Sequence, residues 1–86
     1  MISYICQKDA RLLYEVGHWN KAIIKRVIIP EGWQIHLISK HTHIPTHVLA
    51  SKKGLPRLFK TSDSAIQRCK ELGFTLITIL LSGTDS

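Results

Sequence analysis

The chain has 86 residues, of which 44% are apolar and 21% charged, and its formal net charge is +6. This length allows one domain with a single core and excludes a second domain, while the apolar content excludes an intrinsically disordered chain. The excess of Lys and Arg favours anionic partners, although a surface that only keeps the protein soluble has the same composition.

The N-terminal part of the chain predicts a short strand over residues 2–6. Residues 8–16 fit either a short helix or a strand, because their apolar positions suit both periods. Residues 17–20 have the composition of a turn, in which Gly17 accepts a positive φ at little cost. Polar Gln7, Lys8 and Asp9 follow the first strand directly and leave no room for a signal-peptide core, so we expect a soluble, cytoplasmic protein.

The middle of the chain predicts an antiparallel hairpin. Residues 23–29 are rich in β-branched side chains and predict a strand, which Pro30-Glu31-Gly32 ends in a turn. Residues 33–39 then alternate and place the face that includes Trp33 toward the core. A loop over residues 40–46 leads to a strand at 47–51, a tight turn with Gly54, and a returning strand at 55–60.

The strongest local signals predict a helix over residues 62–72. Thr61 or Ser62 can cap its first turn, and Gly73 can end it in a left-handed conformation. Its apolar stripe consists of Ala65, Ile66, Cys69 and Leu72. Residues 75–81 form a last strand that is apolar on both faces, so it is either central in the sheet or covered by a partner. Residues 82–86 form a flexible tail.

Together these elements predict an α+β fold. We expect a small, mostly antiparallel sheet of four to six strands with the 62–72 helix on one face, and residues 8–16 as a candidate second helix. The strands at 23–29 and 74–81 expose more apolar surface than one short helix covers, which favours a homodimer. The longest apolar run, 74–81, is much shorter than the roughly 20 residues of a membrane span.

Positive charge is polarised toward the middle of the chain. No acidic residue lies between Gly32 and Ser62, so no neighbour in the sequence neutralises the positive charges of the basic turn and strand. Lysines at a turn can follow phosphates as point charges, and an Arg on a strand can make a forked contact to phosphate or guanine. The predicted nucleic-acid-binding residues are Lys52, Lys53, Arg57, Lys60, Arg68 and Lys70.

The histidines and cysteines offer weaker candidates for chemistry. His36, His41, His43 and His47 are loosely spaced without a nearby Cys or carboxylate, so we predict no metal site and no cofactor. Cys69 belongs to the buried helical stripe, and neither it nor Cys6 is predicted to start a helix, as an activated thiolate often does. Two distant cysteines do not form a secreted-type disulfide framework.

Part of the chain resembles known DNA-binding families. From Trp33 to Phe74, the predicted order of three strands and a helix resembles the arm-binding domains of phage and transposon integrases. Residues 53–57 (Lys-Gly-Leu-Pro-Arg) followed by Phe59-Lys60-Thr61 are similar to small accessory proteins of plasmids and mobile elements, in which such a strand enters a capped helix. The resemblance implies binding to DNA, whereas the His-rich loop and the apolar last strand depart from the integrase pattern.

The sequence therefore favours a non-enzymatic accessory protein that binds duplex DNA. No carboxylate or hydroxyl is spaced with a His as an acid–base pair would be, which argues against catalysis. Two alternatives stay open: a protein-interaction module or homodimer with incidental charge, and a small toxin-like ribonuclease.

Overall fold

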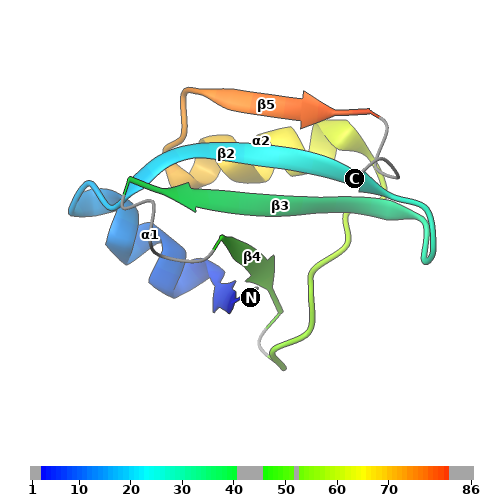
Figure 1. The fold of residues 1–86 in the computed structure, drawn as a ribbon, viewed down its shortest axis with the longest axis horizontal. Coiled ribbons are helices and arrows are strands. Elements are labelled where there is room, and N and C mark those ends of the chain that lie inside the picture. Colours follow the sequence, from blue (N-terminus) through cyan, green and yellow to red (C-terminus); the bar gives the residue numbers. More distant parts are fainter. Residues whose placement is uncertain (1–2, 41–45, 52, 82–86) are drawn as a thin grey trace.

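The computed structural model describes residues 3–40, 46–51 and 53–81. The expected tail at 82–86, most of the His-rich loop, and Lys52 lie outside these ranges. The elements in chain order (Figure 1) are β1 (Ser3–Cys6), α1 (Gln7–Glu15), β2 (Trp19–Val27), β3 (Gly32–Ser39), β4 (His47–Ala50), α2 (Ser62–Leu72) and β5 (Ile77–Leu80).

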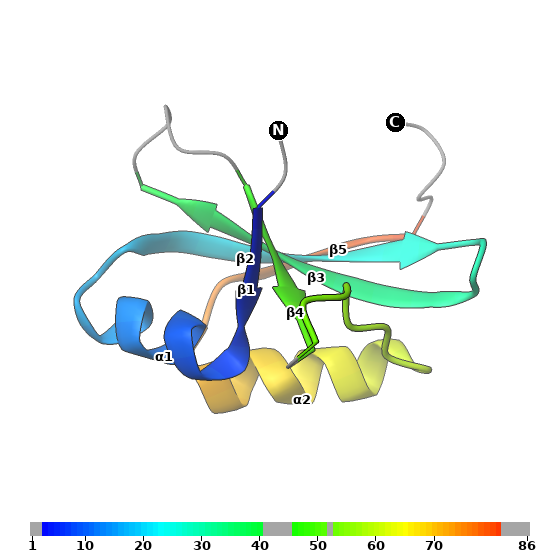
Figure 2. The same cartoon turned by 90° about the horizontal axis from the view of Figure 1, so that it is seen from below.

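The five strands form one mixed sheet in the order β1-β4-β3-β2-β5. β3 pairs antiparallel with β2 and β4, while β1 pairs parallel with β4 and β5 pairs parallel with β2. Both helices lie on the same face of this sheet (Figure 2). The α+β class, the expected number of strands and the packing of α2 on one face are confirmed. The sheet is mixed rather than mostly antiparallel, because the strands at its two edges, β1 and β5, pair parallel with their neighbours β4 and β2.

The core lies between the helices and the sheet. The β2–β3 register sets Ile24 opposite Ile35 and Ala22 opposite Leu37 on the helix side. Trp33 lies on the same face and packs against the core, as its alternation predicted. The other face, here called the open face, follows from the alternation of side chains along each strand. In β2 and β3 the side chains of the open face are those of Lys21, Ile23, Lys25, Val27, Gln34, His36 and Ile38.

α2 confirms the capped helix predicted from the sequence. The Thr61 hydroxyl accepts a hydrogen bond from the Ser64 amide at 3.1 Å. At the other end, Gly73 has a φ of +109°, and the Phe74 amide donates to the Cys69 carbonyl at 3.0 Å. This closing turn satisfies carbonyls that the helix leaves unpaired and buries the Phe74 ring.

The ambiguous segment after β1 is a helix, and the turn that follows it is shorter than expected. Trp19 was assigned to this turn, but it begins β2 and is only 5% exposed. Its indole Nε1 donates to the Ala10 carbonyl at 2.9 Å, so the side chain joins α1 to the sheet. Burial of a large ring with its N–H satisfied outweighs the turn preference of the neighbouring Asn20.

The returning strand expected at 55–60 is an extended segment with two isolated bridges. Ala50 pairs with Pro56 and Trp33 with Phe59. Pro56 has no N–H for a continuous ladder, which explains why no regular strand forms. The three strands expected between Trp33 and Phe74 are therefore two strands and this segment.

β5 lies at an edge of the sheet, with β2 as its neighbour. Of the two alternatives for the last strand, central in the sheet or covered by a partner, the first is wrong, because the described sheet ends with β5. Of the helices in the described ranges, neither is long and apolar enough to cross a membrane.

Gly73 offers a test of how α2 ends. A Cβ added at Gly73 lies 2.5 Å from Cε2 of Tyr14, in addition to the strain of a positive φ. Gly54 has a φ of +81° but nothing within 4 Å of an added Cβ. We expect Gly54→Ala to lower the free energy of unfolding by about 1 kcal/mol and Gly73→Ala by about 3 kcal/mol. Urea denaturation measures both, and equal losses contradict the proposed contact with Tyr14.

Candidate nucleic-acid interface

A groove of about 590 Å³ lies between the segment at 57–60 and one flank of α2. Arg57, Phe59 and Lys60 form one wall, and Ser64, Gln67, Arg68 and Glu71 of α2 line the other. Three of the six predicted binding residues therefore line one groove, although they come from two different parts of the chain.

Phe59 positions the first wall. Its amide donates to the Trp33 carbonyl and its carbonyl accepts from the Trp33 amide, both at 2.9 Å. Its ring is only 7% exposed, so it belongs to the core. Gly32 permits this approach, because a Cβ there would lie 3.2 Å from the Phe59 carbonyl oxygen. The wall is thus held to β3 by backbone hydrogen bonds.

Arg57 is oriented by both its backbone and its side chain. Its amide donates to the Leu49 carbonyl of β4 at 3.0 Å. Its guanidinium lies over the Phe59 ring, 5.2 Å from the ring centroid, in a cation–π contact. In the part of the chain that the structure describes, no carboxylate forms an ion pair with Arg57. The guanidinium edges are therefore available to an anionic ligand.

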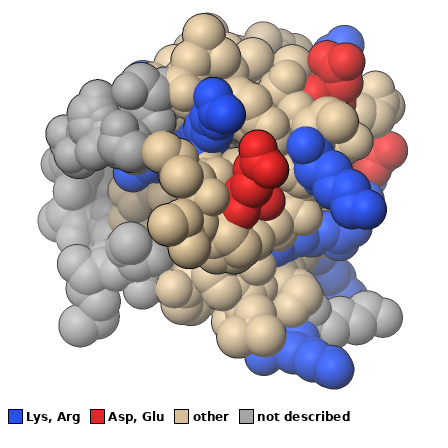
Figure 3. Space-filling model, turned by 90° about the vertical axis from the view of Figure 1, so that its right-hand side faces the viewer, with Lys and Arg blue, Asp and Glu red and all other residues tan. Residues whose placement is uncertain are grey.

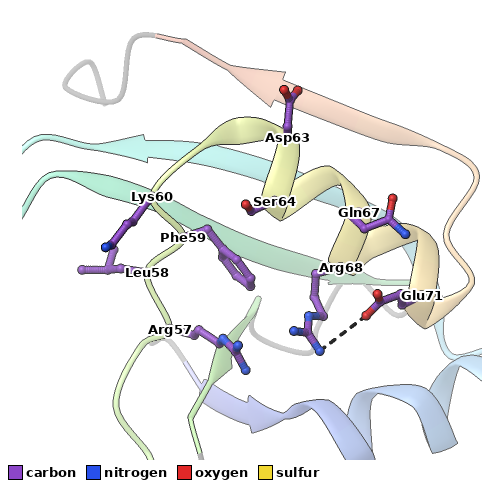
Figure 4. A pocket seen from close by; sticks show the side chains of 9 residues that line it. All are labelled: Arg57, Leu58, Phe59, Lys60, Asp63, Ser64, Gln67, Arg68 and Glu71. Carbon is purple, nitrogen blue, oxygen red and sulfur yellow. Dashed lines mark ion pairs between the residues drawn. The ribbon is translucent and has the colours of Figure 1, made fainter.

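Arg68 forms the opposite side of the groove. Its Nη1 donates to the Gln7 side-chain oxygen at the start of α1 and lies 3.5 Å from Glu71 Oε1. These contacts join the two helices and hold the side chain in place. Figure 4 shows Arg57 and Arg68 extending from opposite walls toward one another, with the dashed line marking the ion pair to Glu71. Two guanidinium groups that face each other favour an anion between them.

The remaining predicted residues lie apart from this pair. The Lys60 side chain points away from Arg68 at the outer end of the groove (Figure 4). Lys53 is exposed in the turn closed by the Gly54 amide and the Ser51 carbonyl, and it does not line the groove. Lys70 follows Arg68 by two residues, or about 200° around a helix, and so projects from the opposite flank of α2. Lys52 lies outside the described residues.

The stretch without acidic residues is not free of acid in space. Asp63 and Glu71 of α2 lie along the groove, because the helix packs beside the basic segment. Figure 3, which shows the right-hand side of Figure 1, has acidic side chains close to the Lys and Arg side chains on that face. The distribution of charge along the sequence therefore predicted a more positive electrostatic potential at the groove than the packed helix allows.

Of the four candidate histidines, the structure describes His36 and His47, and these two lie on opposite faces of the sheet. His36 lies on the open face and forms a 3.1 Å hydrogen bond with the Gln34 side chain. His47 pairs with Leu37 on the helix side, where its ring packs 5.3 Å from the Trp19 ring. His41 and His43 are outside the described residues. Within those residues, no group of three His, Cys, Asp or Glu side chains is placed to hold a metal.

The cysteines differ in their surroundings. Cys69 is fully buried on α2, as predicted, and burial raises the pKa of its thiol to about 11. Cys6 is half-buried and is the N-cap residue of α1, although no helix start was predicted there. Because residues 8–16 fit a helix or a strand equally well in the sequence, no pattern marks Cys6 as the residue before a helix. Both thiols are free.

Sequence patterns missed the partners of Arg68. The three-residue spacing of Arg68 and Glu71 is a signal for a helical ion pair, and it was available in the sequence. Gln7 lies 61 residues from Arg68, and no local pattern indicates their contact.

Comparisons with protein-family models, curated proteins and solved structures gave no match.

The two thiols should differ in reactivity. The thiolate is the reactive form, so burial and the raised pKa of Cys69 protect it. In the native protein we expect a thiol reagent to modify Cys6 alone within minutes, and in denaturant to modify both cysteines. Mass spectrometry of the modified peptides identifies the site. Rapid native labelling of Cys69 contradicts its place in the core.

His36 should make stability depend on pH. Burial, and then the positive charge of Lys25, lower the pKa of His36 below the ordinary value near 6.5. The unfolded chain therefore binds a proton at His36 more readily than the folded chain does. The stability contributed by neutral His36 is present above the ordinary pKa and is lost as the pH falls below it. We expect the free energy of unfolding to decrease between about pH 7.5 and 5.5 less steeply in His36→Gln than in the natural protein. Equal slopes contradict the assignment to His36.

Proposed function

We propose that this protein is a small non-enzymatic accessory protein that binds duplex DNA and holds a backbone phosphate between Arg57 and Arg68. The observation that carries the proposal is the convergence of these two guanidinium groups on one groove, with Arg57 free of a carboxylate partner among the described residues. Guanidinium donors match the geometry of phosphate oxygens in a forked hydrogen bond.

Preorganisation supports this role for Arg57. The cation–π contact with Phe59 and the backbone bond to Leu49 restrict the side chain before any ligand arrives. An ordered donor loses less conformational entropy on binding than a freely rotating lysine. Lys60, at the outer end of the groove, adds a mobile charge that can follow the next phosphate.

The burial of the aromatic ring beside the groove favours a duplex over a single strand. Binding of single strands depends on exposed rings on which bases stack. Phe59 and Phe74 are 7% and 5% exposed, so their faces are occupied by the core. Contacts to the phosphate backbone are then the main source of affinity, and such binding weakens as salt concentration rises.

The two acidic residues beside the groove limit the strength of the interaction. Glu71 shares Arg68, and Asp63 lies at the start of α2 along the same groove. Their charges oppose a polyanion, so we expect affinity to be modest and to depend on the few free cations rather than on net charge alone.

Arg57→Gln tests the proposal against a matched control. Removing a charged hydrogen bond to phosphate should weaken binding to a labelled duplex about tenfold at low salt. It should also reduce the slope of log affinity against log salt by about 0.9, the value for one phosphate contact. Lys70→Gln changes net charge equally on the opposite flank of α2 and should have a much smaller effect. Fluorescence anisotropy at several salt concentrations measures both.

Three outcomes separate the alternatives. Equal losses in Arg57→Gln and Lys70→Gln indicate a general charge effect and contradict the groove. Absence of binding by the natural protein at low salt contradicts the proposed function. Cleavage of RNA in the same mixtures favours the ribonuclease alternative.

A further inference from the structure

We propose that β5 pairs with β5 of a second copy of this chain, antiparallel and about a two-fold axis at Thr78. This surface is separate from the Arg57–Arg68 groove, so the inference does not depend on DNA binding. It specifies the register through which a homodimer would form.

Among the described residues, β5 has a neighbouring strand on one side only. The Ala22 amide of β2 donates to the Leu76 carbonyl at 3.4 Å, and Ala22 is in register with Ile77. Because backbone groups alternate in direction along a strand, those of Thr78 and Leu80 also face β2. The N–H and C=O groups of Ile77 and Ile79 therefore point away from the sheet. No strand in the described part of the chain pairs with them.

This edge lacks the features that usually block pairing. Natural edge strands carry charged residues, prolines or bulges that prevent another strand from joining. Residues 74–81 contain no charged residue and no proline. Four apolar side chains along this strand and its ends are also exposed. They are Leu76 at 60%, Ile79 at 38%, Leu80 at 42% and Leu81 at 69%.

The sequence of the strand identifies a second copy as its partner. Residues 76–80 read Leu-Ile-Thr-Ile-Leu, which is identical in both directions about Thr78. A two-fold interface requires that if one residue contacts another, the reverse contact also occurs. An antiparallel pair centred on Thr78 sets Leu76 opposite Leu80 of the second copy and Ile77 opposite its Ile79. Each Leu of residues 76–80 then lies opposite a Leu of the second copy, and each Ile lies opposite an Ile.

Backbone direction agrees with this register. With the axis at Thr78, the outward groups of Ile77 face those of Ile79 in the second copy, so each such pair exchanges two hydrogen bonds. Thr78 then faces its own copy in the closer, non-hydrogen-bonded position, where Thr–Thr pairs are favourable. A register shifted by one residue turns these groups away from each other.

The other edge of the sheet does not share these features. β1 reads Ser-Tyr-Ile-Cys, which has no such symmetry, and α1 begins directly after it. Pairing through β5 instead joins two five-stranded sheets into one. Because the two-fold axis of such a pair is perpendicular to the sheet, the helices of both copies lie on the same face.

Charge at position 78 tests the register directly. The natural protein should sediment at twice 9.8 kDa at near-millimolar concentration and dissociate on dilution. Thr78→Lys or Thr78→Glu alone should halve that mass, because like charges then lie directly opposite each other. An equimolar mixture of the two variants should restore the dimer, since only this axis sets position 78 opposite itself. Leu55→Lys, at a side chain 63% exposed beside β4, is the control and should stay dimeric.

Crosslinking provides a second readout that does not use charged variants. In a Cys6→Ser background, Thr78→Cys should form an intermolecular disulfide on mild oxidation, since the Cα separation at such a pair permits one. Leu80→Cys, which faces Leu76 of the second copy, should not. A natural protein that is monomeric at near-millimolar concentration overturns the proposal. So do charged variants that remain dimeric, folded variants that fail to pair when mixed, or equal crosslinking at both positions.

Discussion

The two hydrogen bonds between the backbones of Trp33 and Phe59 are the constraint on which the groove depends. They hold an irregular segment against β3 without a continuous ladder, because Pro56 prevents one. Phe59 then serves two purposes, since its buried ring completes the core and also contacts the guanidinium of Arg57. The same attachment sets where α2 begins, three residues later, and therefore where Arg68 lies. A local packing requirement thus determines which cations meet.

The distribution of charge in space differs from its distribution along the chain. A long stretch without acidic residues predicted a strongly basic surface, yet α2 brings Asp63 and Glu71 beside that stretch. Helix packing explains this result, because the flank of α2 that faces the segment includes positions 64, 67, 68 and 71. Among the described cations of the groove, Arg57 and Lys60 form no ion pair with a carboxylate. Specific geometry therefore supports the proposed phosphate contact better than net charge does.

Local signals in the sequence predicted the local structure well. The Thr61 cap, the apolar stripe and the Gly73 stop of α2 act within one or two turns, and all three agree with the structure. The α+β class followed from the same patterns. The contact of Arg68 with Gln7 joins residues that are 61 positions apart, and the place of β5 in the sheet depends on its neighbour β2. The hydrogen bond from Trp19 to Ala10 spans only nine residues, but it joins a strand to a helix. Periodicity describes one element at a time and contains no information on which elements become neighbours.

The parallel pairings at both edges also have a consequence for folding order. β2 and β3 form a hairpin of adjacent residues, whereas β1 and β5 pair with strands that are several elements away along the chain. Closing a long loop costs more entropy than closing a short one, so the hairpin can form early and the edges later. The two terminal strands are then the last to join the sheet and the first to leave it during local opening.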